Sequence, residues 1–182
     1  GHLAGFDEGR TLSLGLVVAG GMLLPDLDLV VSVGSVVGAI GDSVVATWEG
    51  YWGGSTAGHR EVSHTLIGGA GTGLVLGAAA AWVESRRSGR RWRLVGSLGL
   101  CLLGVFGPLV ILGPTVTPMG WVGFGVVLAG AVILGVLAVR RTSLGAGKIL
   151  GGGLLGLLLH PFTDVFLGDP PPMFAPVETA IL

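Results

Sequence analysis

Residues 94–113, LVGSLGLCLLGVFGPLVILG, form an uninterrupted apolar run. A helix needs about 20 apolar residues to cross a hydrocarbon core about 30 Å thick. Residues 119–139 form a second run of this length, and only a short segment containing two prolines separates the two. This part of the chain therefore predicts a transmembrane helical hairpin.

The composition of the whole chain also indicates a membrane protein. Of its 182 residues, 51% are hydrophobic and 12% are charged, whereas a soluble domain has about 25% charged residues. The 36 glycines suit close packing of helices in lipid. The net charge of −1 gives no indication of a nucleic-acid partner.

Three further apolar runs, residues 11–24, 62–83 and 149–167, bring the predicted number of spans to about five. Two basic loops are expected in the cytoplasm, because short loops rich in lysine and arginine are retained there. These loops contain Arg86, Arg87, Arg90, Arg91, Arg93, Arg140, Arg141 and Lys148. The hairpin between them is therefore expected to turn outside the cell.

In this scheme residues 29–48 begin and end on the outer side, so they are expected to form a re-entrant or interfacial segment. Aromatic residues typical of the headgroup region follow at Trp48, Tyr51 and Trp52. The predicted fold is an all-α, polytopic transmembrane bundle of about five spans plus this segment, in the cell membrane. Residues 1–182 are expected to form a single membrane-embedded domain.

Three polar clusters interrupt the apolar sequence: LLPDLDL at residues 23–29, GHREVSHT at 58–65 and LLLHPFTD at 157–164. When each span is followed from its basic loop, all three clusters reach the non-cytoplasmic face. Together they carry Asp26, Asp28, His59, His64, His160 and Asp164. Ionisable side chains inside a membrane domain are candidates for function.

These imidazoles and carboxylates are typical ligands of Zn, Mn or Fe, and six of them could hold one or two divalent ions. Such a site activates water and polarises a phosphoryl or carbonyl oxygen. Arg60 is suited to binding a phosphate, and Glu61 is a candidate base if its side chain turns inward. Ser63 is expected to cap a helix that begins at His64.

The motifs GHL, LLPDLD, GHREVSHT and HPFTD followed by PPPMFAP occur in this order along the chain. In this the chain resembles the LexA-regulated inner-membrane hydrolases, a family of membrane-bound, predicted metal-dependent hydrolases. The resemblance implies that His2 joins the six residues above in the metal site. Leu29 departs from the family pattern, which has histidine there, and Glu61-Val62 replaces Gly-Phe. Only eight residues separate His2 from Thr11, too few to cross a bilayer, so the topology places His2 on the opposite face.

The sequence thus predicts a membrane-embedded, metal-dependent hydrolase acting on an amphiphilic substrate, with a lipid phosphoester as the preferred candidate. Two alternatives remain open at this point. A non-catalytic membrane subunit would use the polar cluster only to join helices, and a metal or proton transporter would use it as a relay. The bilayer and a lipid-linked substrate are the expected partners, and the oligomeric state is not predicted.

Overall fold

The computed structural model describes residues 8–33, 37–38, 40, 43–49 and 61–167. Their regular structure is helical, with no strand in these ranges, which confirms the all-α prediction. The elements are α1 (Glu8–Leu23), η1 (Pro25–Ser32), α4 (Leu66–Ser88), α5 (Arg91–Leu112), η2 (Gly113–Thr115), α6 (Pro118–Arg141) and α7 (Ala146–Leu167).

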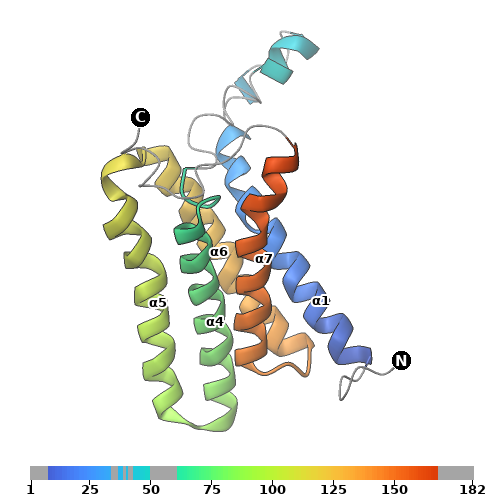
Figure 1. Ribbon diagram of the computed structural model, residues 1–182, viewed down its shortest axis with the longest axis vertical. Coiled ribbons are helices and arrows are strands. Elements are labelled where there is room, and N and C mark those ends of the chain that lie inside the picture. The colour runs from blue at the N-terminus through green and yellow to red at the C-terminus, as the bar shows by residue number, and fades with distance from the viewer. Residues whose placement is uncertain (1–7, 34–36, 39, 41–42, 50–60, 168–182) are drawn as a thin grey trace.

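Helix α4 lies at the centre of the bundle. It packs against α5, α6 and α7, while α1 packs on the far side of α7 and η1 packs on α6 (Figure 1). Helix α4 is also rich in glycine and alanine, and most of its span is buried. Small residues let several neighbours approach one helix closely, which explains why this sequence occupies the centre.

Paired glycines set the distance between α4 and α5. A Cβ atom on Gly71 would lie 2.6 Å from the carbonyl oxygen of Gly104, and one on Gly104 would lie 2.5 Å from the carbonyl oxygen of Gly71. On the other side of α4, Gly73 and Gly77 accommodate the side chains of Leu154 and Leu150 from α7. These glycines therefore allow close helix packing, whereas others, such as Gly99, face open space.

Threonines begin two of the long helices. The side chain of Thr65 accepts a hydrogen bond from the Gly68 amide at 2.8 Å and so caps α4. The prediction that Ser63 caps a helix starting at His64 was wrong, since α4 begins at Leu66. Thr117 caps α6 in the same way, with Pro118 in the first turn.

Three helices, α4, α5 extended by η2, and α6, are long and apolar enough to cross a membrane. Helix α5 also exposes a broad apolar face, including Val95 and Val110 at 73% and 76%. These features indicate membrane association. Helix α1 has 16 residues and is about 24 Å long, shorter than the hydrocarbon core. The count of about five spans stays a prediction. Residues 34–36, 39 and 41–42 of the expected re-entrant segment lie outside the described residues, as do the aromatic Tyr51 and Trp52 that follow it.

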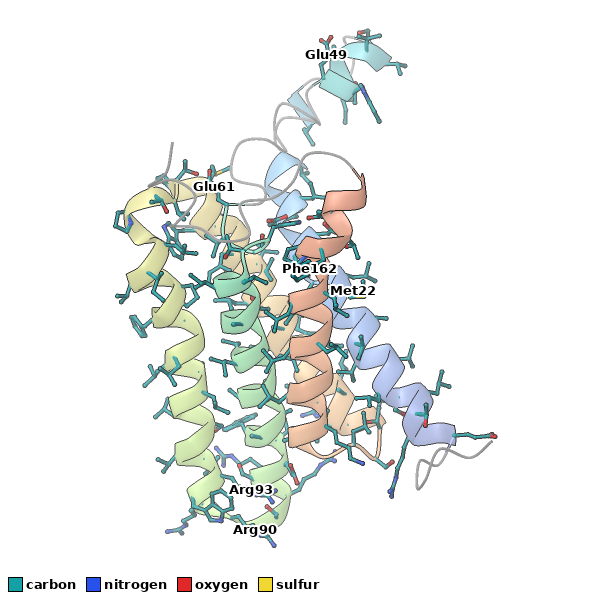
Figure 2. The ribbon with its side chains drawn as sticks, in the orientation of Figure 1. Met22, Glu49, Glu61, Arg90, Arg93 and Phe162 are labelled. Atoms are coloured by element: carbon teal, nitrogen blue, oxygen red, sulfur yellow. The ribbon has the colours of Figure 1, made fainter. Side chains whose placement is uncertain are left out.

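The arginine loop, residues 86–93 around the turn between α4 and α5, lies at the end of the bundle opposite the turn before α4. Figure 2 shows Arg90 and Arg93 at one end and Glu61 at the other. With 23 residues, α4 separates the two ends by about 34 Å. At the arginine end, Glu84 binds Arg93 at 2.6 Å and accepts a hydrogen bond from the Ala146 amide, which joins α4, α5 and α7.

Candidate metal centre

Four side chains from three separate parts of the chain meet at the end of the bundle away from the arginine loop. Asp26 lies in the first turn of η1, directly after α1. His64 lies in the turn that precedes α4. His160 and Asp164 lie one turn apart on α7, as their spacing of four residues predicted.

The four side chains point at one another through one atom each. Nε2 of His64 lies 3.5 Å from Oδ1 of Asp26 and 3.5 Å from Oδ2 of Asp164. Nε2 of His160 lies 3.6 Å and 3.5 Å from the same two oxygens. Ligand atoms of Asp26, His64 and His160 all lie within 4.8 Å of one another, so this group could hold a metal ion.

These spacings fit ligands of one ion better than direct ion pairs. Charge-assisted hydrogen bonds between nitrogen and oxygen are about 2.7–2.9 Å long, and all four distances here are longer. Zinc binds histidine nitrogen and carboxylate oxygen at about 2.0–2.2 Å, which places tetrahedral ligand atoms about 3.3–3.6 Å apart. The four separations between histidine nitrogen and carboxylate oxygen, 3.5–3.6 Å, match that edge length and make up four of the six edges of a tetrahedron.

Burial supports the same interpretation. The residues His64, His160 and Asp164 are at most 5% exposed. Nε2 of His160 and Oδ2 of Asp164 have no hydrogen-bond partner within the described part of the chain. Buried polar atoms normally have such a partner, and a cation between them would satisfy both. Only Asp26, with a side chain 44% exposed, opens the cluster to its surroundings.

The other ring nitrogen of His64 faces a second polar group. Oγ of Ser63 lies 3.1 Å from Nδ1 of His64 and donates a hydrogen bond to Oδ2 of the buried Asp28. That carboxylate oxygen is itself 3.6 Å from Nδ1. A metal-binding histidine usually has its second ring nitrogen oriented by a carboxylate in this way. The predicted ligand Asp28 therefore lies on the Nδ1 side of the His64 ring, whereas Asp26 and Asp164 lie on the Nε2 side.

We expect Ser63→Ala to weaken zinc binding by about 10–100-fold without abolishing it, because the orientation of the His64 ring would be lost. Isothermal titration of the metal-free protein would measure the change. A matched control is Ser97→Ala on α5, where the buried hydroxyl donates a hydrogen bond to the Leu94 carbonyl of its own helix. Equal affinities in Ser63→Ala and the wild type would contradict this role.

The candidate base Glu61 does not join the cluster. Its carboxylate accepts hydrogen bonds from the Thr117 amide at 2.6 Å and from the Thr117 hydroxyl at 2.9 Å. Both oxygens are thereby bound at the first turn of α6, where a negative charge is also favoured by the helix dipole. The structure gives Glu61 a capping role at α6 and no contact with the four converging atoms.

Glu61→Gln is accordingly expected to destabilise the protein by about 1 kcal/mol, because glutamine keeps only one acceptor oxygen for Thr117 and loses the negative charge favoured by the α6 dipole. Metal content should not change. Chemical denaturation in detergent would measure the stability, with the exposed Glu49→Gln as a control for the charge change. A loss of bound metal in Glu61→Gln alone would restore Glu61 as a residue of the site.

Three of the predicted site residues, His2, His59 and Arg60, lie outside the described residues. Sequence reasoning missed the part played by Ser63, although its position next to His64 was a usable signal. No protein-family model, no curated protein and no solved structure matches this chain. The resemblance to the inner-membrane hydrolases therefore rests on the short motifs alone.

Proposed function

We propose that the protein is a membrane-embedded hydrolase that holds a transition metal between Asp26, His64, His160 and Asp164. The observation that carries the proposal is that the two histidine Nε2 atoms each lie 3.5–3.6 Å from the same two carboxylate oxygens. Mixed histidine and carboxylate ligands of this number suit zinc, and also manganese or iron. The predicted second ion would require His59, which lies outside the described residues.

Each residue has a distinct task in this proposal. The bound metal would supply Lewis acidity for activating water and polarising an ester oxygen. Ser63 and Asp28 hold the His64 ring so that Nε2 faces the cluster. Asp26 is the exposed carboxylate at the rim, so it can accept a proton from an entering water molecule.

An amphiphilic substrate is supported by the surroundings of the cluster. Leu27 lies between the two aspartates and is 42% exposed, and Phe162 lies between His160 and Asp164 and is 46% exposed. The elements that carry the polar cluster thus also expose apolar side chains to the outside of the bundle. The cluster lies at the end of the bundle away from the arginine loop, which favours a position of the cluster in the outer leaflet. A phosphoester of a lipid headgroup combines the required polar and apolar parts.

The decisive experiment measures metal content by elemental mass spectrometry after purification without chelators. Wild type is compared with His64→Ala/Asp164→Ala, and both are assayed for phosphate release from phosphatidic acid in mixed micelles. About one equivalent of metal, lost in the variant together with a chelator-sensitive activity, is the expected result.

The other outcomes separate the competing functions. Bound metal without phosphate release from phosphatidic acid would contradict hydrolysis of this lipid phosphoester and favour a transporter or a structural metal. A wild type without metal would contradict the metal site, and would leave the cluster as a means of joining helices in a non-catalytic subunit.

A further inference from the structure

A groove lies between α5 and α6, toward the arginine end of the bundle. Both helices pack along α4 but scarcely contact each other, so they diverge on the surface of α4. The resulting cavity has a volume of about 480 Å³, which is within the usual range of about 300–1,000 Å³ for small-molecule sites. No part of the metal centre lines it.

The lining of the groove is apolar except at one end. Ala78 of α4 forms part of its floor, and Leu98 and Cys101 of α5 face Val132 of α6 across it. Leu98 and Val132 are also exposed at the surface, so the groove opens sideways out of the bundle. In a membrane, an opening of this kind faces the acyl chains of the surrounding lipid.

The length of the groove corresponds to one leaflet. Along α4 it extends from Val75 to Arg86, a distance of about 17 Å. Half of a hydrocarbon core about 30 Å thick is about 15 Å. An acyl chain running along the groove would therefore begin at the level of Arg86 and end near the middle of the bilayer.

The positive charge of Arg86 at the mouth of the groove favours an anionic headgroup. The guanidinium of Arg86 lies over the ring of Trp82, 5.3 Å from its centre, and both residues are exposed. A guanidinium stacked on a ring keeps its N–H groups available for a phosphate. The neighbouring acid, Glu84, is bound to Arg93 and to the Ala146 amide, so its charge is already compensated.

We propose that this groove binds one anionic phospholipid of the leaflet on the arginine side, with an acyl chain between α5 and α6 and the phosphate at Arg86. Basic pockets between transmembrane helices are suited to anionic headgroups. A second copy of this chain is a less suitable occupant of the groove. In the same membrane orientation its own arginines would lie at the level of Arg86, where like charges repel. The proposal is independent of the metal centre.

Native mass spectrometry of the detergent-purified protein tests the proposal with phosphatidylglycerol and phosphatidylcholine of identical acyl chains. We expect one phosphatidylglycerol to bind more tightly than phosphatidylcholine, and Arg86→Gln to weaken its binding about fivefold. Arg10→Gln makes the same charge change at the exposed start of α1 and should have no effect. Equal binding of the two lipids, equal effects of the two variants, or a dimer without lipid would overturn the proposal.

The apolar part of the groove is tested separately. Cys101→Phe should fill the space and weaken both lipids, whereas Val110→Phe changes an exposed position on the same helix outside the groove. Because Cys101 is the chain's single cysteine, its alkylation by a maleimide gives a second measurement in the unmutated protein. Added phosphatidylglycerol should slow this alkylation, and an unchanged rate would contradict the proposal.

Discussion

Replacing His160 with alanine is expected to abolish the stabilisation of the protein by zinc. In the wild type, free zinc at about 1,000 times its dissociation constant should raise the free energy of unfolding by about 4 kcal/mol, because only the folded chain assembles the ligands. His160→Ala removes the nitrogen that lies within 3.6 Å of both Asp26 and Asp164. Thermal unfolding in detergent, with zinc and with a chelator, measures the difference.

The control for this experiment is Cys101→Ala, which removes the one thiol that could bind zinc adventitiously. It should retain the full response to zinc. If zinc stabilised His160→Ala as strongly as the wild type, the cluster at the start of α4 would not be the binding site. A response lost in Cys101→Ala would point to the groove instead.

A leucine at Gly104 is expected to disrupt the packing of α5 against α4. The new side chain would meet the carbonyl oxygen of Gly71 at 2.5 Å, together with the side chains of Leu74 and Val75. Backbone atoms cannot move away as a flexible side chain can, so the loss of stability should reach about 3 kcal/mol, the upper part of the range for overpacking. Denaturation in mixed detergent micelles, followed by circular dichroism, measures this change.

Helix α5 itself offers the matched control. Gly99 lies five residues earlier and has no atom within 4 Å of a Cβ placed on it. Gly99→Leu adds the same side chain to the same helix, so it should not destabilise the protein. Equal destabilisation by both variants would mean that leucine acts through the α5 backbone and not through the contact with α4.

The convergence of Asp26, His64 and His160 could be predicted because it depends on connectivity. Asp26 follows one apolar run, His64 lies near the start of another and His160 lies in the outer half of a third, and counting the runs from the basic loops brings all three to one face. The pairing of His160 with Asp164 followed from helical periodicity in the same way. Neither inference needs the position of an individual atom.

The roles of neighbouring residues could not be predicted, because they depend on the geometry of the turn before α4. Serine and threonine are equally acceptable as helix caps, so the sequence does not distinguish Ser63 from Thr65. In the structure the Ser63 hydroxyl donates to the buried Asp28, and the Thr65 hydroxyl caps the helix. Glu61 looked like a base because it adjoins the histidines in sequence. Its partner Thr117 is distant along the chain, so no local pattern could reveal the contact.

The origin of the site in three distant segments also has a consequence for biosynthesis. When His64 is added to the growing chain, His160 is still 96 residues from being translated, which corresponds to about 5–20 s at typical elongation rates. A nascent chain can hold Asp26 and His64 together during this interval, but it lacks both ligands supplied by α7. Stable binding of the metal would therefore require that α7 has been synthesised and inserted. A chain truncated before α7 should be unable to retain the ion.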